Sequence, residues 1–270
     1  MTRTVIIAGH VLSRLWRQKL VIVTLVVALL IIGLMSSSLF MIRTASQLGQ
    51  PSEAQQMAMG LFFFVTMLMG WFADLVGLVI GVTVTRQDIR DGTVFSLLAK
   101  PVARWEYLLG SYLGSVVYLL LVWLVLTGVY VGLVYVTEQP LGRMHGLVLL
   151  GHAALSLLML SLAFGLAQRF SAWIAALLAV VIYNGDAAVN TLGSLVGLLG
   201  LGMPEWMHKA LVFPLPATNC FDMLFESLMK TQLQSLPWGW GLLHIIDYSA
   251  VMVLLGWWLF RRQDVTSATE

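Results

Sequence analysis

Three aspartates lie inside long apolar stretches of this chain: Asp74, Asp186 and Asp247. A carboxylate at the centre of a membrane-spanning helix costs on the order of 3 kcal/mol on insertion scales, so it is expected to face protein or water rather than lipid. Asn184 and Asn190 add amide groups beside Asp186. Such side chains either line a polar conduit or form structural hydrogen bonds within a helix bundle, and the sequence leaves both interpretations open.

The positions of the three acids along their stretches differ. Asp74 lies twelve residues before the nearest arginine, which corresponds to about 18 Å of helix and places it near a membrane midplane. Asp186 lies seventeen residues beyond the arginine that precedes it, or about 26 Å into the outer half. Asp247 is nearer the outer end of its stretch, with His244 three residues earlier on the same helical face, where a hydrogen bond is possible.

The sequence contains none of three common catalytic or nucleotide-binding motifs. A phosphate-binding GxxxxGK[ST] loop is excluded because none of the four lysines follows a glycine. The chain has no HExxH pair, and Gly193-Ser194 lacks the following glycine of a G-x-S-G nucleophile site. The chain is therefore predicted not to be an enzyme by itself.

Soft metal ligands gather in the segment 203–240. Thioether, thiol and imidazole groups suit monovalent copper, and the segment contains Met203, Met207, His208, Cys220, Met223 and Met229. Methionine is also frequent elsewhere, where it serves packing. Packing is the favoured interpretation, so no metal site is predicted. If a site were present, Cys220, Met223 and His208 would be its candidate ligands. A single cysteine excludes an intrachain disulfide.

The longest concentration of charge lies between two apolar stretches, in residues 86–107. It contains Arg86, Asp88, Arg90, Asp91, Lys100, Arg104 and Glu106 and must lie in water. The spacing of Ile89, Val94 and Leu97 predicts a short amphipathic helix, and Pro101 is expected to end it near Lys100. The alternative is an ordinary charged loop between two spans.

Several residues of this segment carry a resemblance to a known family. Asp91-Gly92-Thr93, Leu97-Leu98, Lys100-Pro101-Val102, Arg104 and Tyr107-Leu108-Leu109-Gly110 resemble the first cytoplasmic loop of ABC-2 permeases, which have the type V exporter fold. In that family the loop contains the coupling helix that seats in the ATPase subunit. The resemblance implies coupling residues at Asp88, Asp91, Gly92, Thr93, Leu97, Lys100 and Arg104. The family often has a glutamate ahead of the Gly-Thr pair, and either Asp88 or Asp91 fills that place here.

The resemblance implies a membrane-spanning permease subunit of an ABC transporter, with export as the expected direction. Expected partners are two copies of a separate ATPase that binds ATP and magnesium, a second permease copy, membrane lipids and an accessory protein on the outer side. A homodimer is the default and a heterodimer the alternative. The second and fifth spans flank the dimer axis in that fold, which makes Asp74, Asp186, Asn184 and Asn190 conduit candidates. Some family members serve copper-enzyme maturation; a channel or scaffold without an energy source is the rival class.

Composition sets the broad class. The chain has 270 residues, of which 59% are hydrophobic and 10% charged, with a mean hydropathy of +0.89. So much apolar surface exceeds what a soluble core buries, which indicates an integral membrane protein. The net charge of +2 gives no indication of nucleic-acid binding.

The hydropathy layout predicts an all-α polytopic membrane protein of one domain. The six expected spans cover residues 20–42, 57–85, 108–136, 144–167, 172–201 and 242–260. Residues 20–42 are too long for the core of a cleavable signal and are interpreted as a retained span. Four prolines in residues 203–240 preclude a regular span there, so short helices at the outer interface are expected.

The first eighteen residues are predicted to form an interfacial helix. At about 100° per residue, the basic side chains share one face, and Val5, Ala8, Leu12 and Trp16 lie roughly opposite. With this segment inside the cell, eleven lysines and arginines are internal and four are external, namely Arg43, Arg143, Lys209 and Lys230. Both termini are thus expected in the cytoplasm, and the resemblance implies a bacterial inner membrane.

Overall fold

The computed structural model describes residues 2–17, 22–23, 26–30, 33–34, 51–90, 103–136, 143–198, 204–212, 214–216, 218 and 238–261. Regular secondary structure in this part of the chain is helical throughout. The helices are α1 (Thr2–Arg17), α3 (Pro51–Arg90), α5 (Arg104–Val136), α6 (Arg143–Ala167), α7 (Ala172–Tyr183), α8 (Gly185–Leu198), α9 (Glu205–Val212) and α11 (Trp238–Arg261). The predicted all-α class is confirmed.

Four helices are long and apolar enough to cross a membrane. They lie within Phe64–Gln87, Arg104–Gly132, Gly146–Ala167 and Gly239–Arg261. The successive helices α7 and α8 pass the same test together, but they are bent by 54° at their junction. The described residues therefore support a membrane protein with four spans, or five if the bent pair crosses as one. Most of the first predicted span, residues 20–42, lies outside the description.

The long helices extend beyond several predicted boundaries. α3 begins at Pro51, six residues before the expected start, because proline is well suited to the first turn of a helix, where its missing N–H needs no partner. α3 continues to Arg90 and α5 begins at Arg104, so both helices enter the segment expected as a charged loop. Of the residues that predict the amphipathic helix, Ile89 lies in α3, whereas Val94, Leu97 and Lys100 lie outside the described residues.

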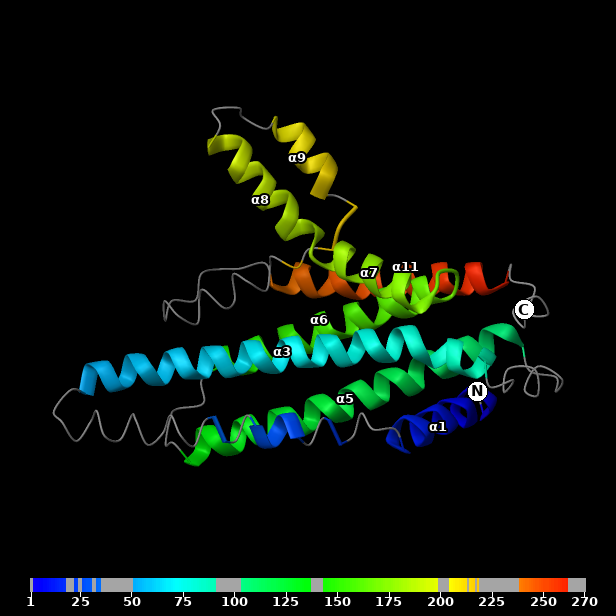
Figure 1. Cartoon of the computed structure of the whole chain (residues 1–270), viewed down its shortest axis with the longest axis horizontal. Helices are drawn as coiled ribbons and strands as arrows, with labels where there is room; N and C mark the ends of the chain where they lie inside the picture. The colour runs from blue at the N-terminus through cyan, green and yellow to red at the C-terminus, as the bar shows by residue number, and fades with distance from the viewer. Residues whose placement is uncertain are drawn as a thin grey trace.

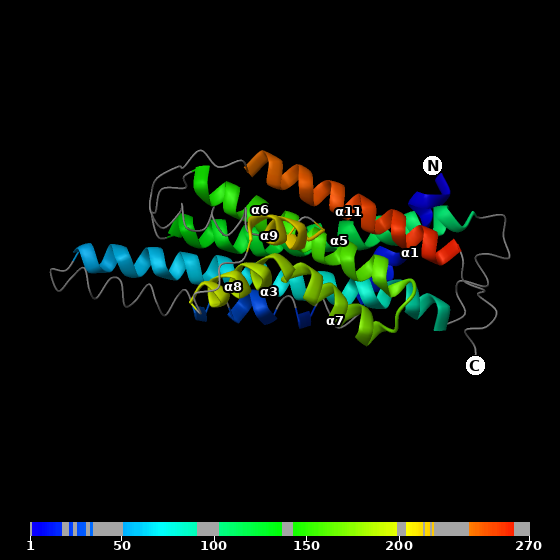
Figure 2. The same cartoon turned by 90° about the horizontal axis from the view of Figure 1, so that it is seen from above.

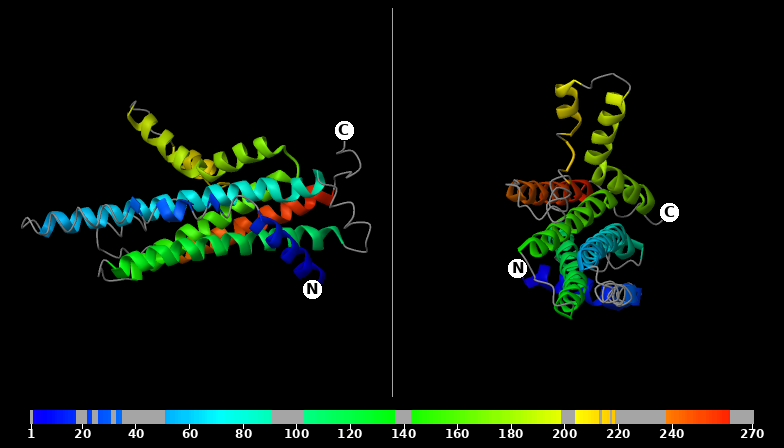
Figure 3. Two further views of the ribbon diagram at one scale, coloured as in Figure 1. Left: turned by 60° about the horizontal axis from the view of Figure 1, so that its bottom comes forward. Right: turned by 90° about the vertical axis from the view of Figure 1, so that its left-hand side faces the viewer.

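The helices α3, α5, α6 and α11 run lengthwise beside one another and form the body of the molecule (Figures 1 and 2). α8 and α9 extend away from this body as a pair, which is clearest in the end-on view of Figure 3. α1, the end of α3, the start of α5 and the end of α11 lie at the same end of the bundle (Figure 1).

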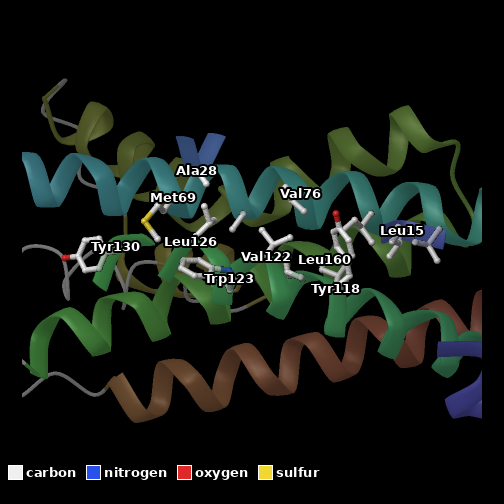
Figure 4. Packing of buried hydrophobic residues seen from close by; sticks show 14 of the residues in the cluster. Leu15, Ala28, Met69, Val76, Tyr118, Val122, Trp123, Leu126, Tyr130 and Leu160 are labelled. Carbon is white, nitrogen blue, oxygen red and sulfur yellow. The ribbon is translucent and has the colours of Figure 1, made fainter. Parts of the chain in front are cut away.

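The largest hydrophobic cluster fills the space between α3 and α5 (Figure 4). Met69 and Val76 from α3 meet Trp123 and Leu126 from α5, and all four are buried. Ala28 packs against the same cluster from the segment 26–30. A second cluster joins α6, α7 and α11. The apolar residues inside the bundle therefore hold its helices together, while many other large apolar side chains are exposed on its outside.

Glycines allow the closest helix contacts. A Cβ atom at Gly81 would lie 2.8 Å from the carbonyl oxygen of Leu160, and one at Gly77 would lie 2.9 Å from that of Ser156. Such distances leave no room for a methyl group, so these glycines are what lets α3 approach the backbone of α6. Gly114 has the same function on α5, because a Cβ there would lie 2.7 Å from the carbonyl oxygen of Ala8 in α1.

α1 packs on the bundle by an apolar stripe beside the face that the sequence assigned to the membrane interface. Its buried stripe consists of Ile7, Val11 and Leu15, which follow one another at intervals of about one helical turn. Val5 and Trp16, in contrast, are 68% and 58% exposed. The sequence predicts two faces for this helix, one basic and one apolar. The helix has three, because one apolar stripe contacts α5 and another remains available to the membrane.

Candidate functional site

The segment that resembles a coupling loop connects the end of α3 at Arg90 to the start of α5 at Arg104. We call this end of the bundle the loop end (Figure 1). Among the predicted coupling residues, Arg104 is described in full and Asp88 lies in the last turns of α3. Asp91, Gly92, Thr93, Leu97 and Lys100 lie outside the described residues.

At the loop end, Arg86 joins α3 to the end of α6. Its Nε donates to the carbonyl oxygen of Ala167 at 3.2 Å, and its Nη2 donates to the carbonyl oxygen of Phe170. The last carbonyls of a helix have no partner within that helix, and a cation stabilises them. Gln168 adds a second link, because its Nε2 donates to Thr85 Oγ1 at 3.1 Å. The end of α3 is thereby fixed to α6.

Two further arginines make similar links. Arg14 Nη2 on α1 donates to the carbonyl oxygen of Val84 on α3 at 3.1 Å. Arg104 Nη1 on α5 donates to the carbonyl oxygen of Arg261, the last residue of α11, at 3.2 Å. Basic residues that sequence patterning placed on one side of the membrane therefore also bind carbonyl groups near helix ends. Both helices that flank the predicted loop are held by arginine, α3 through Arg86 and Arg14 and α5 through Arg104.

A second polar site is centred on Asp74 in the middle of the bundle. Asp74 Oδ1 accepts a hydrogen bond from Ser156 Oγ of α6 at 2.8 Å, and Oδ2 accepts one from the Tyr183 hydroxyl at 2.9 Å. Tyr183 is the last residue of α7. The carboxyl group therefore joins three helices, α3, α6 and α7. These contacts satisfy the requirement that an acid within a span meets polar partners.

The bend between α7 and α8 holds the other three conduit candidates. Asn184 occupies the junction, and its Nδ2 donates back to the carbonyl oxygen of Val180 at 2.9 Å. Asp186 is only 4% exposed, lies in the first turn of α8 and accepts a hydrogen bond from Asn190 Nδ2 at 3.2 Å. An acid in the first turn of a helix is stabilised by the unpaired N–H groups there. The local polar residues thus favour a new helix start at this point.

Tyr183 connects the two polar sites. It binds Asp74 through its hydroxyl and immediately precedes the bend at Asn184. Asp74 and the bend residues were predicted as site residues from the sequence, whereas Tyr183 and Ser156 were not. Each is a polar side chain within a mainly apolar helix, which was the available signal, but only the packing of α3, α6 and α7 shows that both face Asp74.

The expected hydrogen bond between His244 and Asp247 is not among the contacts of this histidine. His244 Nε2 lies 3.4 Å from the carbonyl oxygen of Leu215, and its ring contacts Tyr248 with centroids 6.3 Å apart. Asp247 itself is exposed. The reason is that Leu215, from the segment after α9, lies close enough to engage the imidazole.

The metal candidates fall mostly outside the description. Cys220 and Met223 lie outside the residues that the structure describes. His208 lies in α9, where the structure describes its backbone only. In the part of the chain that the structure covers, no three histidine, cysteine, aspartate or glutamate side chains form a group that could hold a metal ion.

The chain was also compared with known proteins. No protein-family model and no curated protein sequence matches it.

Proposed function

We propose that this chain is the membrane-spanning permease subunit of an ABC transporter, and that its loop end couples transport to ATP hydrolysis by a separate subunit. The proposal is supported by two features that occur together at the loop end. The residues that resemble a coupling helix occupy the connection between α3 and α5, and arginines fix both of these helices to the rest of the bundle. A force applied to the connection would therefore be transmitted to α3 and α5, and through their arginine contacts to the neighbouring helices.

The geometry supplies a route for that force into the membrane. α3 is one continuous helix, and Asp74 lies sixteen residues from its end at Arg90, a distance of about 24 Å. At Asp74 the helix is bonded to Tyr183, next to the bend between α7 and α8. Movement of α3 would therefore displace the bend. In this proposal Asp74, Asn184, Asp186 and Asn190 lie beside the conduit, which opens and closes as the bend moves.

The proposed assembly contains two permease copies and two ATPase copies in a bacterial inner membrane, with the loop end on the cytoplasmic side. ATP and magnesium bind to the ATPase, and export is the proposed direction. A homodimer provides the second half against which the α7–α8 pair moves.

The experiment is co-purification of the permease with its ATPase after substitution of the loop. Asp91→Arg, Thr93→Arg and Leu97→Arg are each expected to reduce the retained ATPase roughly tenfold or more, because an unpaired charge buried at an interface costs about 2–5 kcal/mol. Phe170→Arg is the matched control, since Phe170 is exposed beside the loop end but outside the predicted loop. Its complex is expected to remain intact.

The yield and thermal unfolding of each variant show whether the permease still folds. ATPase retention that is unchanged in all three folded loop variants would show that the loop does not couple the subunits. If no nucleotide-binding protein co-purifies with wild type, the rival interpretation, a channel or scaffold without an energy source, takes its place.

A further inference from the structure

A long apolar groove lies between α5, α6 and α11. Its volume is about 860 Å³, and its walls are almost wholly aliphatic, with Leu113 and Leu120 on the α5 side, Ile246 and Leu254 on the α11 side, and Ala154 of α6 between them. α11 packs chiefly on α6 and only slightly on α5, which leaves the groove between α5 and α11. It is separate from the Asp74 site and from the contacts of Arg86.

The described part of the first predicted span does not fill this groove. Residues 26–30 pack through Ala28 into the cluster between α3 and α5. The groove is lined by an adjoining side of α5, at Leu109, Leu113 and Leu120, and it borders that cluster at Tyr112 and Val116. Since helical neighbours recur every three or four residues, these leucines share one face of α5, beside the face that carries Trp123 and Leu126.

The dimensions of the groove match one leaflet of a bilayer. Its lining extends from Leu109 to Leu120 on α5, about 16.5 Å at 1.5 Å per residue, and from Leu254 back to Leu242 on α11, about 18 Å. One leaflet contributes roughly half of the 30 Å hydrocarbon core. At this depth the surrounding solvent is hydrocarbon, so an aliphatic groove open to the membrane suits an extended acyl chain.

Two cations lie at the loop end of this groove. Arg104 precedes Leu109 by five residues, or about 7.5 Å, and Arg104 Nη1 bonds the backbone of Arg261. Both arginines are exposed. Glu106 of α5 accepts a hydrogen bond from the backbone N–H of Ala103 at 3.1 Å, and this corner therefore has two cations and one nearby acid on α5. Guanidinium groups bind phosphate oxygens in a bidentate fashion, so this corner is complementary to an anionic headgroup.

We infer that this groove binds an anionic phospholipid from the leaflet at the loop end, with one acyl chain between α5 and α11 and the headgroup phosphate at Arg104 and Arg261. The lipid would fill the space that the side chains leave between these helices. The inference does not rest on the proposed transport function, because it depends only on the bundle and its membrane.

The test uses phosphatidylglycerol that carries a photoreactive diazirine in its acyl chain, with the protein reconstituted in vesicles of phosphatidylcholine and phosphatidylglycerol. In wild type, adducts are expected to concentrate on the groove residues of α5, α6 and α11. Ala154→Phe and Ala250→Phe, which fill the groove, should abolish this concentration. Ala187→Phe, at an exposed position of α8, should leave it unchanged.

Substitutions of the two arginines test the binding of the headgroup separately. Arg104→Gln and Arg261→Gln should each reduce groove labelling by phosphatidylglycerol about fivefold, the effect of one basic side chain near an anionic surface. Arg169→Gln is the control, because Arg169 is exposed at the same end but outside the groove. A phosphatidylcholine probe should label the groove weakly and show no response to either substitution.

Three outcomes would overturn the inference. Adducts spread evenly over the groove and the exposed residues Trp71 and Leu177 would mean that only bulk lipid contacts the protein. Equal labelling by both probes would remove the headgroup site. Efficient disulfide cross-linking between two chains that carry Ile246→Cys would show that a second copy covers the groove. None of these results bears on ATPase binding, so they are distinguishable from failure of the proposed function.

Discussion

Asp74 is the residue on which three helices converge, and its role can be measured as a coupling energy. Asp74→Asn keeps one acceptor oxygen, so one of the two hydroxyl groups loses its acceptor. Tyr183→Phe removes the hydroxyl on α7. Because both changes affect the hydrogen bond of 2.9 Å, the double variant should lose less stability than the sum of the single variants, by about 0.6 kcal/mol or more. Unfolding in detergent micelles provides the measurement.

Tyr135→Phe is the matched control for the loss of a hydroxyl group, since Tyr135 is 81% exposed on α5. Its effect should add to that of Asp74→Asn. From the proposed function, Asp74→Asn and Asp186→Asn are expected to leave assembly and basal ATP hydrolysis of the complex largely intact and to lower transport. Strict additivity of Asp74→Asn and Tyr183→Phe would contradict the link between α3 and α7.

At the scale of elements, the contact between α3 and α6 depends on glycine. Gly81→Ala is expected to lower the free energy of unfolding by about 1–3 kcal/mol, because its Cβ would lie 2.8 Å from the carbonyl oxygen of Leu160 and 2.6 Å from the Cβ of Ala163. Neither backbone nor Cβ atoms can rotate away, so the helices must separate. Thermal unfolding of the purified protein measures the loss.

The same helix offers a control with the opposite sign. Gly60, also on α3, has nothing within 4 Å of a Cβ placed there. Gly60→Ala should therefore be neutral or stabilising, by up to about 1 kcal/mol, because alanine is the better helix former. If the two substitutions had equal effects, helix propensity rather than close packing would account for both glycines.

For the whole molecule, the arrangement of helix ends predicts which positions share one side of the membrane. Cysteines are placed singly in a Cys220→Ser background at His10, Arg169 and Trp240, all of which are exposed. His10 and Arg169 belong to the loop end, whereas Trp240 lies near the opposite end, at the start of α11 (Figure 1). A membrane-impermeant maleimide should label the first two from the cytoplasmic side only, and Trp240→Cys from the outer side only.

Sealed right-side-out and inverted vesicles separate these cases, with detergent-permeabilised vesicles as the control for reactivity. Labelling of His10→Cys and Arg169→Cys from opposite sides would contradict a common loop end. Labelling of both from the outer side would retain the fold and reverse the orientation that the lysine and arginine count predicts.

The sequence by itself determined the helical class, the membrane environment and the approximate positions of several helices. Apolar stretches of more than twenty residues have few alternatives in a bilayer, because backbone groups there must bond within a helix. This is why α6, at Arg143–Ala167, differs by one residue at its start from the predicted span. The Asn184–Asp186 interruption was likewise visible as polar residues within an apolar stretch, although not as a bend of 54°.

The tertiary structure alone decided which polar groups meet. Asp74 is 82 residues from Ser156 and 109 residues from Tyr183 in the sequence. Only the packing of three helices brings these two hydroxyl groups to the carboxylate. The buried stripe of α1 and the carbonyl partners of Arg86 were equally inaccessible, because helical periodicity identifies an apolar or basic face but not the surface that it contacts. Hydrophobic burial is non-directional, whereas hydrogen bonds depend on the relative positions of helices that are remote in sequence.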